Sequence, residues 1–176
     1  MKKQNAIIIF IILVAVGALW YAFLRTNKVE TPFVGYVDAT YNIEGRVVTL
    51  MNGQSSMEAG PESAARIETK IFGNEVRGDF DSDGDEDIAF LLTQSSGGSG
   101  TFFYAVVALK EEMGYRGTNA ILLGDRIAPR TTEYRDGAII VNFADRADGE
   151  PITTRPSIGK SLYFNIDGTS LREIQR

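Results

Sequence analysis

The residues of this chain best suited to chemistry are five aspartates that occupy every second position from residue 79 to residue 87. Counted from the first, they occupy positions 1, 3, 5, 7 and 9, and Gly84 stands at position 6. In a tightly curled loop, side chains at positions 1, 3 and 5 face one centre, and the glycine lets the chain reverse sharply. Calcium takes about six to eight oxygen ligands. The spacing therefore predicts a Ca²⁺ site with the carboxylates of Asp79, Asp81, Asp83 and Asp87 and the main-chain carbonyl of Asp85 as ligands.

Oxygen donors favour calcium over zinc or copper at this loop, and magnesium is the weaker candidate because it tends to keep its waters. The loop is not an EF-hand, since that motif carries a glutamate at position 12, where this chain has Phe90. The alternative is a solvated acidic turn without an ion. That alternative leaves the repulsion among closely spaced carboxylates unrelieved, whereas a divalent cation would remove it.

Composition excludes several other kinds of site. The chain has 176 residues, of which 44% are hydrophobic, and it contains no cysteine and no histidine. Cysteine nucleophiles, Ser-His-Asp triads, ordinary zinc sites, disulfides and anchoring through a lipidated cysteine are therefore excluded. The net charge is −5, although residues 1–28 carry only basic charges, so the rest of the chain is more acidic still. An acidic domain without a basic stripe predicts no binding to nucleic acid.

An uninterrupted run of uncharged, mostly apolar residues occupies positions 6–24. As a helix it would span about 28 Å, close to the roughly 30 Å hydrocarbon core of a membrane. Trp20 and Tyr21 near its far end are of the types enriched at membrane interfaces. The run predicts a single-pass membrane anchor, and the alternative is a cleaved signal peptide that releases the protein. The expected organisation is an anchor over residues 1–28 and one extracytoplasmic calcium-binding domain over residues 29–176.

Beyond a short linker, the sequence shows repeated strand patterns and almost no helical period. Continuous apolar runs at residues 88–93 and 101–109 predict buried strands, the first of them central. Glu44-Gly45, Asp136-Gly137 and Asp167-Gly168 lie between strand-like runs and predict tight hairpins. The predicted fold class is mainly β, an antiparallel sheet or sandwich preceded by one N-terminal transmembrane helix. Further strands are expected at residues 65–76 and 120–123, and loops at residues 54–64 and 94–100.

The pattern D-x-D-x-D-G-x-x-D, followed by Ile88-Ala89-Phe90, resembles the calcium loops of FG-GAP and VCBS-type β-repeats. That resemblance implies the same ligand assignment, although those families repeat the motif in successive blades and this chain carries it once. A longer stretch, most specifically GTNA…LLGDRIAP within residues 117–129, is similar to an uncharacterised family of bacterial exported and envelope proteins, sometimes found beside META-type domains. The similarity implies a location and a domain extent, and no activity.

These features predict a membrane-anchored, extracytoplasmic, calcium-binding module that is not an enzyme and that binds an envelope protein or a surface glycan. The rival prediction is a carboxylate-dependent, glycosidase-like hydrolase of the cell envelope, which needs two acids converging across a cleft. Outside the aspartate loop its candidate residues are Asp125, Glu133 and Asp145, whose spacing is not specific. Asp125-Arg126 and Asp145-Arg146 are more simply interpreted as ion pairs at the surface.

Overall fold

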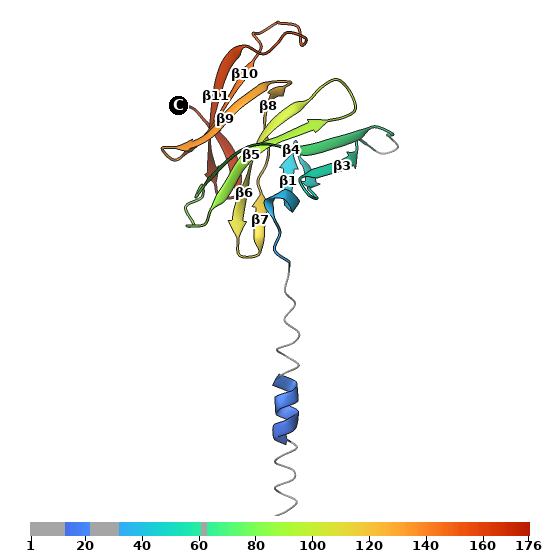
Figure 1. Cartoon of the computed structure of the whole chain (residues 1–176), viewed down its shortest axis with the longest axis vertical. Helices are drawn as coiled ribbons and strands as arrows, with labels where there is room; N and C mark the ends of the chain where they lie inside the picture. Colours follow the sequence, from blue (N-terminus) through green and yellow to red (C-terminus); the bar gives the residue numbers. More distant parts are fainter. Residues whose placement is uncertain (1–12, 22–31, 61–62) are drawn as a thin grey trace, which may run out of the picture. The chain divides into compact units, whose positions relative to one another are not determined.

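The structure is a computed structural model that describes residues 13–21, 32–60 and 63–176. It divides into two compact units, Met1–Pro32 and Phe33–Arg176. In the first unit, residues 13–21 form an α-helix (Figure 1). The other residues of the predicted anchor, 6–12 and 22–24, and the predicted domain boundary at residue 28 lie outside the described residues. Within the described ranges, no helix has the length and apolar character needed to cross a membrane.

The second unit is mainly β, with antiparallel pairing between its strands, which confirms the predicted class. A short 3-10 helix, η1 (Tyr36–Asp38), precedes the strands. They are β1 (Thr40–Ile43), β2 (Arg46–Thr49), β3 (Gln54–Glu58), β4 (Arg66–Gly78), β5 (Asp87–Ser95), β6 (Phe102–Glu111), β7 (Gly114–Gly117), β8 (Ile121–Asp125), β9 (Ala128–Arg135), β10 (Ala138–Asp145), β11 (Ile158–Asp167) and β12 (Ser170–Ile174).

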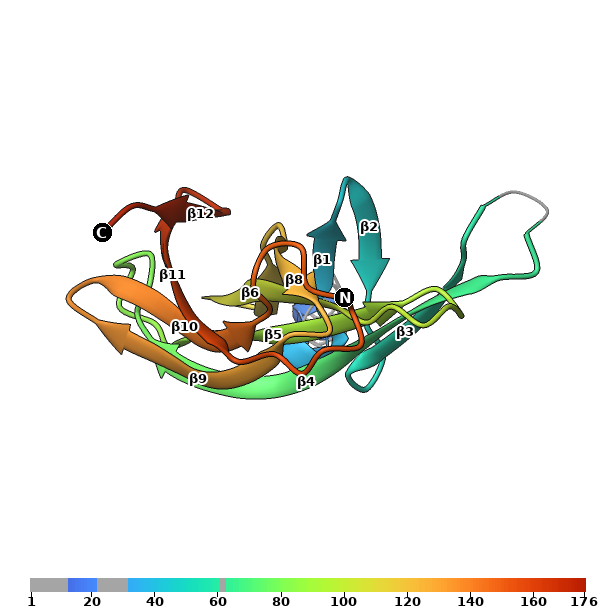
Figure 2. The same ribbon diagram turned by 90° about the horizontal axis from the view of Figure 1, so that it is seen from above.

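The strands form three sheets. A six-stranded sheet runs in the order β3-β4-β5-β6-β7, with β8 also paired to β6, and a four-stranded sheet runs β12-β11-β10-β9. The β1–β2 hairpin is a separate two-stranded sheet. Figure 2 shows the long, bent strand β4 with β9 beside it, so the two larger sheets meet along these strands. Strand β5 is central, as predicted, because it lies between β4 and β6.

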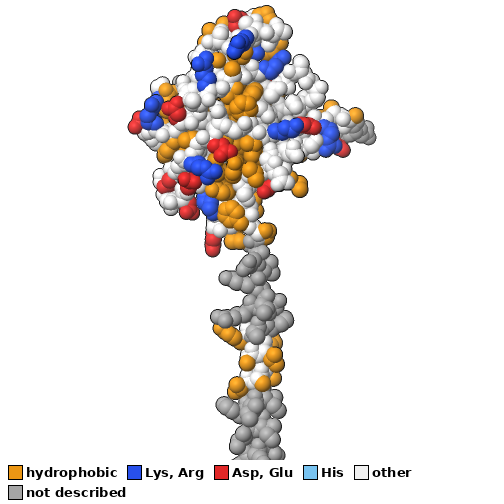
Figure 3. All heavy atoms as spheres, in the orientation of Figure 1, with side chains coloured by type: hydrophobic (Ala, Val, Ile, Leu, Met, Phe, Trp, Pro, Cys, Tyr) orange, Lys and Arg blue, Asp and Glu red, His pale blue; other side chains and the backbone are white. Residues whose placement is uncertain are grey.

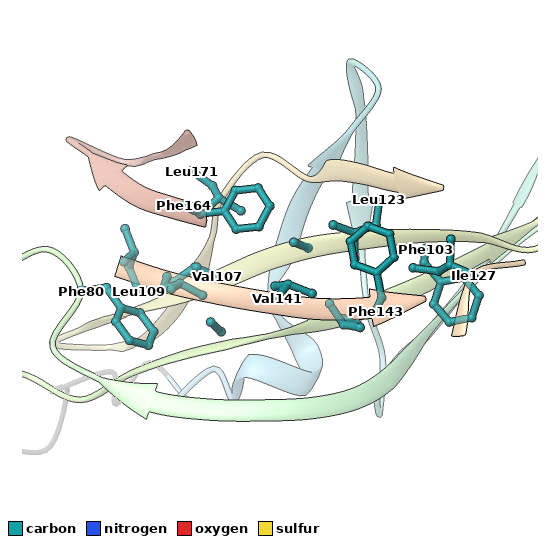
Figure 4. Packing of buried hydrophobic residues seen from close by; sticks show 14 residues of the cluster. Phe80, Phe103, Val107, Leu109, Leu123, Ile127, Val141, Phe143, Phe164 and Leu171 are labelled. Carbon is teal, nitrogen blue, oxygen red and sulfur yellow. The ribbon is translucent and has the colours of Figure 1, made fainter. Parts of the chain in front are cut away.

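Strands β5 and β6 are buried on both faces, which explains their continuous apolar runs. Successive side chains of a strand point to opposite faces. One set, including Phe90, Tyr104 and Val106, packs with Tyr41 and other residues of the β1–β2 hairpin. The opposite set packs with β8 and the four-stranded sheet, as Figure 4 shows for Phe103, Val107, Leu109, Val141, Phe143 and Phe164. A strand covered on one face only would alternate apolar with polar residues.

The predicted hairpins are present. Glu44-Gly45 and Asp136-Gly137 form two-residue turns with both residues at positive φ, the type I′ pattern that matches the strand twist. The third turn lies one residue later than predicted, at Gly168-Thr169, because Asp167 pairs with Ser170 across the hairpin. There only Gly168 has positive φ (59°), which is the requirement of a type II′ turn.

Two strand assignments need correction. Residues 54–64 were expected to be a loop, yet Gln54–Glu58 is strand β3, paired with β4. Its side chains are mostly exposed because it is the edge strand of its sheet, so no core contact imposes an apolar pattern on it. Strand β7 was not predicted, since it is short and has glycine at both ends.

The glycines of β7 permit a close approach of β1. A Cβ atom at Gly117 would collide with the carbonyl oxygen of Thr40 and the ring of Tyr41. Beside this contact, Asn42 N donates a hydrogen bond to the Thr118 carbonyl oxygen at 3.1 Å. The absent side chain at Gly117 is therefore what lets the β1–β2 hairpin settle against the central sheet.

Gly117→Ala should lower the free energy of unfolding by about 1–3 kcal/mol, because the hairpin must shift to admit the methyl group. The measurement is urea denaturation of the full chain in mild detergent. The matched control is Gly159→Ala in β11, where a Cβ meets nothing within 4 Å. That control should change stability by less than about 0.5 kcal/mol. Equal effects of the two substitutions would contradict the close approach.

Candidate metal centre

The aspartate loop connects β4 to β5, and the sheet holds its two ends together. Gly78, the last residue of β4, pairs with Asp87, the first residue of β5. A Cβ atom at Gly78 would lie 2.9 Å from ring atoms of both Phe80 and Tyr134, so glycine is needed where these rings close over the strand end. Because neighbouring strands fix both ends, the intervening residues can only form a compact loop.

Three of the predicted ligands converge. Carboxylate oxygens of Asp79, Asp81 and Asp87 lie within 4.8 Å of one another. Calcium binds oxygen at about 2.3–2.6 Å, so oxygens around one ion lie up to roughly 5 Å apart. The three carboxylates therefore fit a single calcium ion. Asp79 and Asp81 are accessible to solvent, whereas Asp87 is fully buried.

The main-chain amides of the loop turn inward toward its own carboxylates. Asp79 accepts hydrogen bonds from Asp83 N and Gly84 N, both at 3.1 Å, and Asp83 Oδ1 accepts one from Asp85 N at 2.8 Å. Ser82 and Gly84 adopt positive φ, which makes the tight curl predicted from the glycine. Asp83 does not belong to the group of three converging carboxylates. Ligation by Asp83 and by the Asp85 carbonyl stays a prediction.

Asp87 connects the loop to the core. Its Oδ2 accepts a hydrogen bond from Phe80 N at 2.9 Å, and its Oδ1 accepts one from Lys110 N of β6 at 2.8 Å. Burial raises the pKa of Asp87 above its ordinary value, and these two hydrogen bonds oppose that rise. Burial also raises the pKa of Asp81, and the charge of neighbouring Asp83 adds to it. Both carboxylates would thus gain from a nearby cation.

Arg77, the arginine nearest to the loop in sequence, forms ion pairs with Glu75 and Glu86 and not with the converging aspartates. Arg77 lies 3.1 Å from Glu86 and 3.8 Å from Glu75 in ion pairs on the exposed side of the strands. Glu86 therefore points to a protein cation, while Asp79, Asp81 and Asp87 face one another. Within the acidic run, the charge of Glu86 is thus balanced by an arginine, whereas the three converging carboxylates form the group suited to bind a metal ion.

Tyr134, on strand β9, is a residue of this centre that the sequence analysis missed. Its hydroxyl donates a hydrogen bond to the Asp79 carbonyl oxygen at 3.0 Å. Its ring packs edge-on against Phe80, with 4.8 Å between ring centroids. The contact joins the loop to the four-stranded sheet. It spans more than fifty positions along the chain, so no local pattern could have indicated it.

The acids considered for a hydrolase make ion pairs or hydrogen bonds instead. Asp125 pairs with Arg126 at 2.7 Å, as predicted, whereas Asp145 pairs with Lys160 at 2.7 Å and not with Arg146. Each partner lowers the pKa of its aspartate, chiefly through the side-chain hydrogen bond. A general acid working near neutral pH needs a raised pKa. Glu133 accepts hydrogen bonds from Thr131 and Asn142 on the four-stranded sheet.

Comparison with known proteins gives no relative from which a role could be transferred. No protein-family model matches the chain, and no curated protein or solved structure matches it either. The resemblances to FG-GAP loops and to bacterial envelope proteins therefore stay predictions.

Asp125→Asn should lower the free energy of unfolding at neutral pH by about 1–3 kcal/mol, since a hydrogen-bonded charge is lost. The folded-state pKa of Asp125 lies below its ordinary value of 3.8, so its stabilisation is present above that value. The stabilisation is lost as the pH falls through the folded pKa. Denaturation curves of the variant and the wild type should therefore converge on acidification.

Asp167→Asn is the matched control for this pH series. Asp167 forms an ion pair with Arg172 at 2.9 Å, but both side chains are more than half exposed. Such surface pairs contribute about 0–1 kcal/mol. A loss at Asp125 no larger than that at Asp167, or one that does not depend on pH, would contradict the assignment.

Proposed function

We propose that this chain is a membrane-anchored, extracytoplasmic module that binds one calcium ion, performs no catalysis, and recognises an envelope protein or a surface glycan. The observation that carries the proposal is the convergence of Asp79, Asp81 and Asp87 on one point at the start of the central strand. The chemistry of the donors supports calcium, because all three are hard carboxylate oxygens and no nitrogen or sulfur ligand accompanies them.

Bound calcium would stabilise the fold and take no part in a reaction. Asp79 and Asp81 belong to the loop, and the Asp87 carboxylate is held by an amide of β6. An ion shared by these groups would join the loop to the core and reduce their mutual repulsion. Extracellular calcium modules bind in the range of about 10⁻⁴–10⁻³ M, which suits a site with accessible acids.

The location rests on the N-terminal run. Residues 6–24 carry no charge and, as a helix, would match the thickness of a bilayer core. Residues 13–21 are helical, and the large apolar side chains among them, such as Leu13, Leu19 and Trp20, are exposed. Exposed apolar side chains on a helix are favourable where lipid replaces water.

The surface of the second unit supports a partner other than nucleic acid. On the face shown in Figure 3, Lys and Arg side chains of the described residues lie beside Asp and Glu over most of the surface, although several Lys and Arg gather at the upper end. A band of hydrophobic side chains runs between them. Phosphate backbones are bound by clustered positive charge, whereas the chain beyond residue 28 carries a net negative charge. A protein or a neutral glycan is the better match.

Calcium should raise the melting temperature of the full chain by several degrees relative to chelator. At free calcium near 100 times the dissociation constant, linkage adds about 2.7 kcal/mol of stability. Asp81→Ala should remove most of this difference, since it deletes one of the three converging carboxylates and leaves no oxygen in its place. The measurement is thermal unfolding in detergent, with calorimetric titration of calcium.

Glu86→Ala is the matched control, because Glu86 lies in the same acidic run but pairs with Arg77. It should leave the calcium-dependent difference nearly intact. Equal melting temperatures in calcium and chelator, with no heat of binding, would mean that the run is a solvated acidic turn.

The full chain should sediment with membranes and need detergent for release, because an uncleaved apolar run at residues 6–24 would anchor it in the bilayer. Salt or alkaline carbonate washes, which remove peripheral proteins, should leave it in the pellet. Mass spectrometry of the mature protein should find the N-terminal region intact. A mature N-terminus at Leu19 or beyond would replace the anchor with a cleaved signal peptide.

A further inference from the structure

The β1–β2 hairpin covers only part of the face of the central sheet on which it lies. Leu92 of β5 pairs with Tyr104 of β6, and both are buried with the hairpin residues. The next pair on the same face is Gln94 with Phe102, and here the cover ends: Phe102 is 38% exposed. The edge of this cover is the Glu44-Gly45 turn.

A hollow of about 220 Å³ lies where the cover ends. Its walls combine residues of the hairpin and of the sheet, principally Ile43, Glu44, Arg46, Gln94, Phe102 and Tyr104. Apolar and hydrogen-bonding surface are thus mixed in one concave site. The volume is below the roughly 300–1,000 Å³ of pockets for drug-sized ligands, so it suits a single small ring.

Glu44 is held in this hollow at a conformational cost. It has φ 52° at the first turn position, where asparagine, aspartate or glycine is favoured. Its Oε1 accepts a hydrogen bond from the hydroxyl of Tyr104 at 2.9 Å. Residues kept at such angles by surrounding contacts are found disproportionately at functional sites. The strained turn places a carboxylate beside the exposed ring of Phe102 in the wall of the hollow.

We propose that this hollow binds one neutral sugar ring of a surface glycan. The opposite charges of Glu44 and Arg46 cancel, which favours an uncharged ligand. Sugar hydroxyls both donate and accept hydrogen bonds. The Glu44 carboxylate already accepts from Tyr104, but a carboxylate has further lone pairs. Arg46 donates to the Ala59 carbonyl oxygen at 3.3 Å and Gln94 donates to Thr69 Oγ1 at 3.2 Å, and both side chains have further N–H groups for a ligand. The apolar face of the ring packs against Phe102.

The inference rests on the proposed binding role of the module, and it selects a glycan over a protein partner. The hollow and the aspartate loop lie at opposite ends of β5: Asp87 begins the strand, and Gln94 and Ser95 end it in the hollow wall. Failure of sugar binding would therefore be distinguishable from failure of calcium binding. Each ligand should affect the NMR signals of residues near its own end of β5.

The test is NMR titration of the isotope-labelled full chain with glucose, galactose, mannose and N-acetylglucosamine, in calcium and in a detergent without a sugar headgroup. At least one sugar should give saturable shifts of the amides of residues 94–96 and 102–104, with a dissociation constant near about 1 mM, as expected for a small ligand. Glucuronic acid should bind more weakly, because a carboxylate meets Glu44.

Phe102→Ala should raise the dissociation constant at least about tenfold by removing the ring that packs against the sugar. Phe72→Ala is the matched control, since Phe72 is 47% exposed but packs against Phe103 and does not line the hollow. That variant should bind as the wild type does. Arg46→Gln, at an exposed position, gives a second test should Phe102→Ala fail to fold, and it should also weaken binding.

Any of four results would overturn the proposal. These are the absence of saturable shifts with every neutral sugar, shifts confined to other parts of the chain, tighter binding of glucuronic acid, and equal binding by Phe72→Ala and the variants of the hollow. Binding of calcium in the same samples, read at the amides of residues 79–87, would show that only the glycan inference had failed.

Discussion

The burial of β5 and β6 on both faces is the constraint on which the rest of this structure depends. Two adjacent strands that are apolar on both sides cannot lie at a surface, so each face must be covered. The β1–β2 hairpin covers one face, and β8 with the four-stranded sheet covers the other. Residues far apart in sequence, such as Tyr41 and Phe143, serve this one requirement from opposite sides.

The aspartate loop takes its geometry from that central pair. Asp87 is the first residue of β5, and its carboxylate accepts hydrogen bonds from a β6 amide and from Phe80. A carboxylate buried in this way is positioned by the core and not by the exposed part of the loop. Asp79 and Asp81 then approach it because the β4–β5 pairing leaves a short closed path. The same hydrogen bonds would connect an ion bound by these carboxylates directly to the centre of the fold.

Strand β5 also links the two candidate sites. Its first residue belongs to the aspartate loop, and its last residues reach beyond the hairpin into the hollow beside Glu44. Rigid central strands are well suited to hold such groups, because their side chains are fixed by packing. An ion that secures one end of β5 and a ligand that contacts the other end would act on one structural element. The edge strand β3 contributes no residue to either site.

The sequence by itself determined the mainly β class, the buried central strands, two of the hairpin turns at their predicted residues and the position of the acidic loop. These features depend on local sequence, because an apolar run, a pair of turn residues or a ligand spacing each occupies no more than about a dozen consecutive positions. Only the tertiary structure decided that Asp79, Asp81 and Asp87 converge while Asp83 bonds to Asp85 N, and that Lys160 is the partner of Asp145. It alone placed Tyr134 against Asp79, made an edge strand of a polar segment expected to be a loop, and left Phe102 uncovered beside Glu44. Tyr134 with Asp79, and Glu44 with Tyr104, join segments separated by tens of residues, where distance along the chain carries no information about distance in space. The loop carboxylates are close in sequence, but they converge because the pairing of β4 with β5 fixes both ends of the loop.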